Sequence, residues 1–200
     1  MPHIVGERVR LREYRPEDLV PIRGWVNDAE IVSNLSDIFL YPHTLESTQE
    51  FLIAMMDQKP DCRSFVIAEA ATELYLGQIG LDAIDWKNRV GRIGIVIGSP
   101  DNFGRGYGTE AMKLLSAYAF SELNLNRLEL EVYDFNARAI RSYLKCGFRE
   151  EGRLRQKLYR HGRYADVVQM GLLREEWERG QEQERVQERE EGRNGDLPLA

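Results

Sequence analysis

The sequence predicts a single α/β domain of the α+β type, with a mixed sheet flanked by helices. Apolar and polar residues alternate in strand-like segments, most clearly over 127–133. A helical pattern begins directly after the glycine-rich turn 104–108. The 200 residues are enough for one full hydrophobic core, with little left for a second. The predicted order is strand, two helices, three antiparallel strands, helix, strand, helix and a final hairpin.

The first third of the chain is expected to form one strand and two helical segments. Alternation predicts a half-buried strand over 8–14, and proline with two acids at 16–18 opens a helix that breaks near 27–28 and reaches Ile31. Thr44 is expected to cap the next helix, and this helix should end at residues 59–61. This helix is expected to bury Leu45, Phe51, Leu52 and Met55.

Three strands are predicted in the middle of the chain, over 64–70, 75–81 and 92–97. Their short connections favour antiparallel pairing. The helix after the glycine turn should then connect 92–97 to a strand over 127–133. Because such crossovers are right-handed and link parallel neighbours, these two strands should be adjacent and parallel.

A helix over 137–145 and a hairpin of 149–159 with 164–173 complete the predicted domain, which spans residues 1–173. Gly147 is the expected C-cap of the helix, and His161-Gly162 the hairpin turn. Residues 174–200 carry nine acids and five bases, and form a charged tail. We expect this tail to be a solvated helix to about Glu191, or disordered.

Composition limits the classes of function. The net charge of −6 argues against nucleic-acid binding, which needs a basic surface. Cys62 and Cys146 are too few for a disulfide framework and are expected to be free thiols, buried or half-buried. The three histidines have no metal-ligand spacing, so no metal site is expected. No leader or membrane span is evident, which favours a cytoplasmic protein without a membrane partner.

A strand, a glycine-rich turn and a helix start follow one another over 95–110. Gly104, Gly106 and Gly108 allow a tight backbone that a ligand can approach closely. Unpaired N–H groups and the helix dipole favour an anion at this point. The spacing fits neither the P-loop, which needs Lys-Ser or Lys-Thr, nor the dinucleotide fingerprint.

Two motifs together resemble the GNAT N-acetyltransferase superfamily. The glycine turn is similar to that family's acetyl-CoA pyrophosphate loop, Gln/Arg-x-x-Gly-x-Gly/Ala, although Phe103 stands at the Gln/Arg position. Residues 136–148 match the family pattern N-x-x-A-x-x-x-Y-x-K-x-G-F at every fixed position. The resemblance covers about Val9 to Leu173. An aromatic residue at the position of Phe103 resembles the branch of the family that acetylates the N-termini of ribosomal proteins.

The resemblance implies acetyl-CoA as acetyl donor and a sheet of about seven strands that splays between the fourth and fifth. The thioester would lie in that gap. Ile95 and Ile97 would pair with the pantetheine arm, and an N–H near Val96 or Ile97 would hold the oxyanion. Asn136 would contact the cofactor arm, cap its helix, or do both. The pyrophosphate would be held by Phe103, Gly104, Arg105, Gly106, Tyr107, Gly108 and Thr109.

The same resemblance assigns the proton transfers. Tyr143 matches the tyrosine that protonates the CoA sulfur, and its phenol is a donor at neutral pH. Glu131 matches a glutamate that acts as base, often through water. Alternation places Glu129 on the same strand face, so it is a rival. Three aspartates near predicted strand ends are further candidates to bind or deprotonate the amine, namely Asp82, Asp85 and Asp166.

A protein N-terminal amine is the first expectation for the acceptor. The related branch also includes enzymes that acetylate polyamines, antibiotics and amino acids, so a small-molecule amine is the alternative. A regulatory module that binds acyl-CoA without turnover would need the glycine loop but neither Glu131 nor Tyr143. The resemblance also allows a homodimer.

Overall fold

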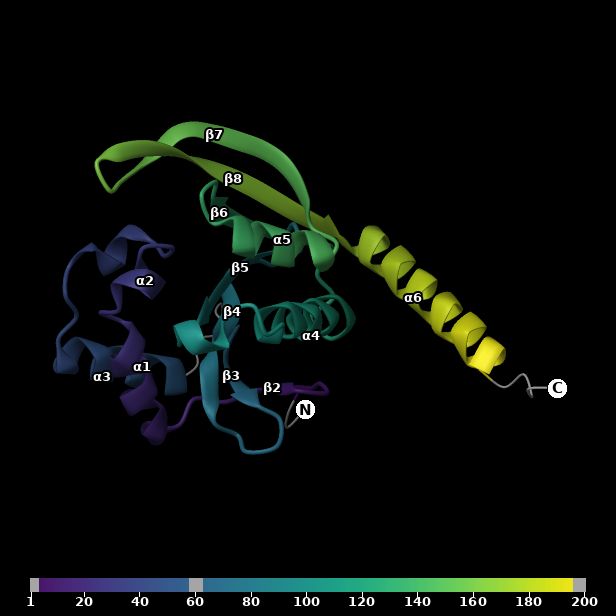
Figure 1. Cartoon of the computed structure of the whole chain (residues 1–200), viewed down its shortest axis with the longest axis horizontal. Helices are drawn as coiled ribbons and strands as arrows, with labels where there is room; N and C mark the ends of the chain where they lie inside the picture. Colours follow the sequence, from purple (N-terminus) through teal and green to yellow (C-terminus); the bar gives the residue numbers. More distant parts are fainter. Residues whose placement is uncertain (1–3, 58–62, 196–200) are drawn as a thin grey trace.

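The computed structural model describes residues 4–57 and 63–195. It has an open eight-stranded sheet with the strand order β1-β2-β3-β4-β5-β6-β8-β7 (Figure 1). The short N-terminal strand β1 brings the number to eight, where about seven were predicted. The strands are β1 (Ile4–Val5), β2 (Val9–Arg12), β3 (Arg63–Glu69), β4 (Tyr75–Asp85), β5 (Val90–Ile97), β6 (Arg127–Tyr133), β7 (Arg149–Arg160) and β8 (Arg163–Leu173).

The helices are α1 (Leu19–Trp25), α2 (Ala29–Val32), α3 (Leu45–Met56), α4 (Tyr107–Ser121), α5 (Ala137–Lys145) and α6 (Arg174–Gly195). Short 3-10 turns form η1 (Pro16–Asp18), η2 (Asp37–Leu40) and η3 (Pro100–Asn102). The predicted break near residue 28 is confirmed, because the Asp28 side chain accepts from the backbone N–H groups that start α2. None of the helices in the described ranges combines the length and apolar character needed to cross a membrane.

The Thr44 cap of α3 is confirmed, since its hydroxyl accepts from Ser47 N at 3.1 Å. Leu52 is buried and Phe51 and Met55 are half-buried, as predicted. Leu45 is 47% exposed, so its predicted burial is wrong. It is the first residue of α3 and projects past the edge of the core. The predicted helix stop at 59–61 and Cys62 lie outside the described residues.

Helices cover the two faces of the sheet unequally. α4 and α5 pack on one face, where β3, β4, β5 and β6 contribute Ile67, Leu81, Ile93, Leu128 and Leu130. On the opposite face, α1 and α3 cover β3 and β5 through a second core. This second layer does not extend to β6, whose outward residues include the exposed Glu131. The sheet is therefore open on one side of β6 and β8.

β5 and β6 form the one parallel pair among the described strands, as the crossover argument predicted. Pairing is confined to Val90–Arg92 and Arg127–Glu129, after which the strands diverge. This splay corresponds to the predicted gap between the fourth and fifth strands, which become the fifth and sixth when β1 is counted. α4 begins beside the splay and connects the two strands.

The β7–β8 hairpin is long and bent. Its tip turns through His161 and Gly162, which both have positive φ, as expected for the predicted two-residue turn. Register shifts between Leu154 and Leu158 bend β7. As a result, the hairpin arches over β6 toward α2 (Figure 1).

α6 leaves the opposite end of the hairpin and runs away from the sheet (Figure 1). It continues to Gly195, beyond the expected end near Glu191. Its first turns touch the domain, since the Trp177 ring lies 5.4 Å from that of Phe120.

Candidate active site

The glycine loop presents an open backbone at the start of α4. Gly104 and Gly106 have φ values of +73° and +87°, which L side chains rarely adopt. Among the described residues, an added Cβ at Gly104 would meet no heavy atom within 4 Å, and one at Gly106 would meet only the Arg8 guanidinium. The first N–H groups of α4 have no partner within the helix. This cradle fits a phosphate group.

Two arginines accompany the loop. Arg105 lies within it and is exposed. Arg8 reaches it from the start of β2, with its guanidinium 4.7 Å from the centre of the Tyr107 ring. Their charges add to the favourable helix dipole for an anion.

The end of β5 lies directly against the start of α4. The Ile95 and Ile97 side chains come within 3.8 Å of the position that a Cβ on Gly108 would take. Gly98 N donates to Leu76 O, so the backbone groups of Gly98 face β4. Successive residues of a strand face opposite neighbours, so the N–H and C=O groups of Ile95 and Ile97 face away from β4, toward the splay. Val96 faces β4 instead. Of the two expected oxyanion donors, only the Ile97 N–H therefore faces the gap.

α5 is fixed against α4 beside this gap. Thr109 Oγ1 and Ser142 Oγ are 2.8 Å apart, and Cys146 Sγ lies 3.5 Å from Thr109 O. The Cys146 thiol is half-buried, as predicted. Asn136 accepts from Ala139 N at 3.1 Å and so caps the helix. Gly147 has a φ of +90° and ends it, as predicted.

Tyr143 projects from α5 into the main core and is half-buried. Its ring packs at 6.3 Å from that of Phe148. Burial raises the pKa of Tyr143 above its ordinary value, and the nearby Cys146 raises it further. Within the described part of the chain, its hydroxyl has no hydrogen-bond partner. At neutral pH, Tyr143 is therefore protonated and its hydroxyl can act as a donor.

The open face of β6 carries the two glutamates suggested as bases, each in an ion pair. Glu131 binds Lys157 Nζ through both carboxylate oxygens, at 3.1 and 3.2 Å. Glu129 lies 3.3 Å from Arg127, which also pairs with Glu151. The polar side chains that line a depression beside the splay are those of Arg92, Arg127, Glu129, Glu131, Glu151 and Gln169.

Asp82 lies across the splay from Glu131, at the edge formed by β4 and β5. The β4–β5 register shifts between Leu81 and Ala83, so Asp82 is the extra residue of a bulge. Its carboxylate lies over Gly94, where an added Cβ would come within 2.4 Å of Oδ2. Continuing the β5–β6 register would bring Gly94 opposite Glu131. Partial burial raises the pKa of Asp82, and Arg92 opposes this shift.

The other two aspartates stabilise turns. Asp85 accepts from Asn88 N at 2.9 Å and Asn88 Nδ2 at 2.7 Å, and these bonds lower its pKa. Asp166 accepts from Gln156 N at 2.9 Å and so holds the bend of β7. Both carboxylates already have structural partners.

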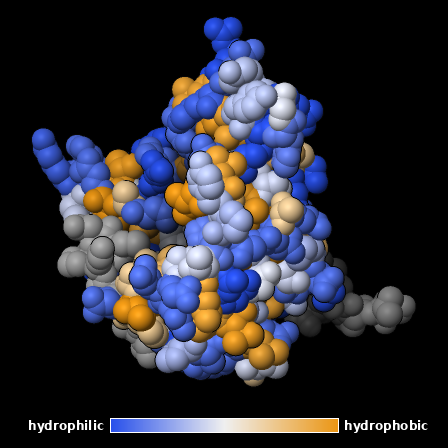
Figure 2. All heavy atoms as spheres, turned by 90° about the vertical axis from the view of Figure 1, so that its left-hand side faces the viewer, coloured by the Kyte–Doolittle hydropathy of each residue, from blue (hydrophilic) through white to orange (hydrophobic). Residues whose placement is uncertain are grey.

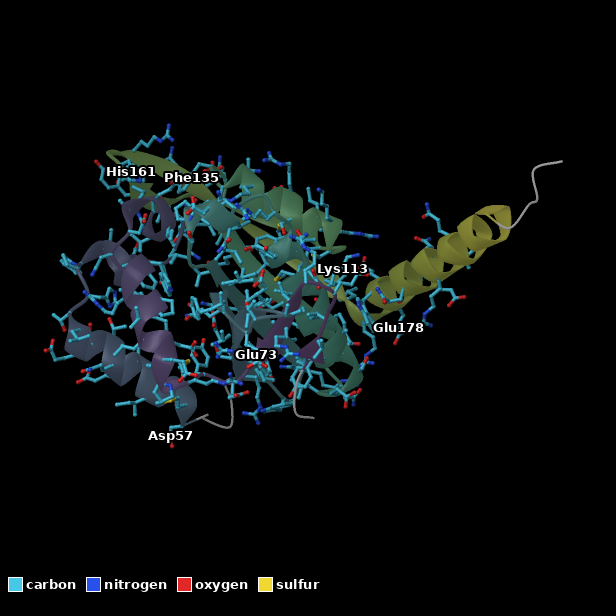
Figure 3. The ribbon with its side chains drawn as sticks, turned by 60° about the horizontal axis from the view of Figure 1, so that its bottom comes forward. Asp57, Glu73, Lys113, Phe135, His161 and Glu178 are labelled. Carbon is cyan, nitrogen blue, oxygen red and sulfur yellow. The ribbon has the colours of Figure 1, made fainter. Side chains whose placement is uncertain are left out.

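A contact between the hairpin tip and the α2–η2 segment forms a wall beside the open face. Arg160 is only 7% exposed and donates to Leu35 O at 3.2 Å and Asp37 Oδ1 at 2.8 Å. Tyr133 of β6 also donates to Leu35 O, at 3.1 Å. Figure 3 shows His161 at the hairpin tip and Phe135, just after β6, at this same end of the molecule.

Sequence reasoning missed this wall because its partners are more than 90 residues apart along the chain. The surface on this side mixes hydrophobic groups with hydrophilic ones (Figure 2).

Across residues 4–57 and 63–195, no group of three or more His, Cys, Asp or Glu residues could hold a metal ion.

The chain is similar to several acetyltransferases. It is 29% identical over 180 residues to an uncharacterized N-acetyltransferase of Bacillus licheniformis, covering 88% of this chain and 99% of that one. It is 33% identical over 115 residues to a spermidine N(1)-acetyltransferase of Vibrio cholerae, covering 58% and 65%. It is 38% identical over 102 residues to a putative ribosomal N-acetyltransferase of Bacillus subtilis, covering 51% and 55%.

Solved structures share the fold. The spermidine N-acetyltransferase from Vibrio cholerae in complex with CoA and spermine aligns with a TM-score of 0.76 and 26% identity, over 86% of this chain and 99% of that chain. Residues 8–149 match the acetyltransferase (GNAT) domain, which includes the glycine loop, the splay and α5. The chain therefore belongs to the GNAT family of acetyltransferases.

Proposed function

We propose that this acetyltransferase moves an acetyl group from acetyl-CoA directly to a primary amine. The observation that carries the proposal is the splay between β5 and β6. The glycine loop and Tyr143 lie on one face of the sheet at this gap, and Asp82 and Glu131 lie on the opposite face. An acetyl donor and an amine can therefore approach the gap from opposite sides.

The chain's own residues fit acetyl-CoA. The pyrophosphate would take N–H groups from residues 103–109, with charge added by Arg105. The free edge of β5 at Ile95 and Ile97 would pair with the pantetheine arm. Asn136, which already caps α5, would lie near that arm. When bound, acetyl-CoA supplies the thioester whose C–S bond breaks as the new C–N bond forms.

Three groups handle charge and protons. The Glu131 carboxylate accepts a proton from the ammonium form of the amine, directly or through water, because the amine must be neutral to attack. The Ile97 N–H donates to the oxygen that gains charge. Tyr143 donates its phenolic proton to the departing thiolate, and the second proton, which the nitrogen loses as the amide forms, returns to the phenolate through water. The ion pair with Lys157 holds Glu131 on the face from which the amine arrives.

We propose a cationic small amine of the polyamine type as the acceptor. Asp82 lies over β5 and Glu131 projects from β6, so each strand that borders the gap has a carboxylate, which suits an acceptor with several positive charges. Similarity to the spermidine N-acetyltransferases supports the same choice. A protein N-terminus is the second candidate, because Phe103 and the putative ribosomal relative favour it.

CoA release from acetyl-CoA tests the proposal with four acceptor classes: polyamines, short peptides with free N-termini, aminoglycosides and amino acids. Peptides with blocked N-termini serve as the control. Faster turnover of polyamines than of any peptide would support the proposed acceptor. Turnover of free peptides alone would favour the protein N-terminus. Tight binding of acetyl-CoA without turnover of any amine would favour a regulatory module.

A further inference from the structure

The glycine loop has an aromatic side chain where the family pattern has Gln or Arg. Phe103 immediately precedes Gly104, and its ring is anchored against the core between the sheet and α1 and α3. The ring has no N–H group and no charge to offer a phosphate. Another residue is needed if a side-chain donor is to act at this position.

Arg138 of α5 places a positive charge beside Phe103. Its guanidinium carbon lies 3.5 Å from the centre of the Phe103 ring, a close cation–π contact. Within the described residues, no carboxylate lies within 4.0 Å of this guanidinium. The Arg138 side chain is exposed, but partial desolvation lowers its pKa and the charge of Glu30 raises it, while arginine stays protonated at neutral pH.

The position of Arg138 is fixed relative to the loop. Asn136 caps the same turn of α5, and the Thr109–Ser142 contact joins this helix to the first turn of α4. Stacking on Phe103 limits the rotamers of the Arg138 side chain. Its N–H groups remain at the edge of the guanidinium, where they can donate to an anion.

We propose that Arg138 binds a pyrophosphate oxygen of acetyl-CoA and replaces the side chain that Phe103 does not provide. Phe103 acts as the platform that aims the guanidinium. With Arg8 and Arg105, Arg138 completes a set of three arginines around the loop. This inference rests on acetyl-CoA binding in the proposed function and adds a cofactor-binding residue to it.

Calorimetric titration of CoA and dephospho-CoA, which lacks the 3′-phosphate, tests the role without measuring turnover. Arg138→Gln is compared with the wild type and with Arg141→Gln, a control that removes an exposed arginine from the same helix. We expect Arg138→Gln to weaken both ligands about tenfold and Arg141→Gln to weaken neither by more than about twofold.

Three results would overturn the proposal. Arg138→Gln could bind both ligands as the wild type does, or it could lose affinity for CoA alone, which would indicate the 3′-phosphate. Equal losses in the two variants would indicate a general effect of charge. Failure of the wild type to bind CoA would instead reject the proposed function, so the two failures are distinguishable.

Discussion

The two sides of the β5–β6 splay are built in different ways. On the side of the glycine loop, the site consists mainly of backbone groups, glycines and one tyrosine from two short stretches of sequence, with arginines around them. On the side of Asp82 and Glu131, it consists of charged side chains from β4, β6 and β7 and a wall made by distant segments. The first side has a general shape for a phosphate-bearing ligand, and the second has the charges that would select an acceptor.

In the proposed function, this difference separates the chemistry of the donor from that of the acceptor. Backbone groups keep their positions when side chains are exchanged, so the loop side can remain the same among relatives with different substrates. Ion pairs such as Glu131–Lys157 change with single substitutions. Variants of the loop side should therefore change turnover or donor binding, and variants of the open side should change the response to the amine.

The largest effect is expected for Tyr143→Phe. Without the phenolic proton donor, kcat should fall at least about a hundredfold while the affinity for acetyl-CoA stays within about twofold. CoA release and calorimetric binding measure the two quantities. Tyr118→Phe is the control, since Tyr118 is a half-buried tyrosine that packs on the same core against Phe65. A loss of only a few-fold in kcat would remove Tyr143 as the acid.

The next effect is expected for Glu131→Gln, which removes the proposed base. Turnover at neutral pH should fall about a hundredfold, while the affinity for acetyl-CoA stays within about twofold. Glu129→Gln is the matched control on the same strand face. If Glu129→Gln instead caused the larger loss of turnover, Glu129 rather than Glu131 would be the base.

Arg160→Met tests whether the wall belongs to the acceptor side. The variant leaves Asp37 and the Leu35 carbonyl without this donor, so we expect a loss of about 1–3 kcal/mol in the free energy of unfolding. The KM for the amine should rise and the affinity for acetyl-CoA should not change. Arg163→Met is the control at the exposed hairpin tip. A variant with unchanged stability and KM would show that the wall is unimportant.

The smallest effects are expected for Asp82 and Asp85, and they have opposite signs. Burial raises the pKa of Asp82, so its ionisation opposes folding once the pH rises through the acid range. Asp82→Asn should therefore melt slightly higher than the wild type at pH 7, and the difference should vanish at about pH 3. The same variant should raise the KM of a cationic amine about fivefold.

Asp85 is the control within the same hairpin. Hydrogen bonds from Asn88 lower its pKa, so its contribution to stability is present at neutral pH and is lost as the pH falls through that lowered pKa. Asp85→Asn should melt slightly lower than the wild type at pH 7 and leave the KM unchanged. If both variants changed the KM equally, Asp82 would have no special place at the splay.

Local patterns predicted the parts of the molecule that neighbouring residues control. Alternation over 127–133, the Thr44 cap and the Gly147 helix end were all found as expected, because each depends on φ/ψ preferences and hydrogen bonds within a few residues. The parallel pairing of β5 and β6 was also predicted, since the handedness of a crossover restricts where the second strand can lie. These features were sufficient to place the glycine loop beside the splay.

Only the tertiary structure decided the open side and the details of the loop. The Arg160 wall and the stacking of Arg138 on Phe103 join segments that are distant along the chain, and the bulge that presents Asp82 depends on how β4 pairs with β5. The exposure of Leu45 was also decided by the tertiary structure, since it depends on where the first turn of α3 lies relative to the core. Such contacts depend on strand order, strand bending and helix packing, and these properties belong to the assembled domain rather than to a local stretch of sequence.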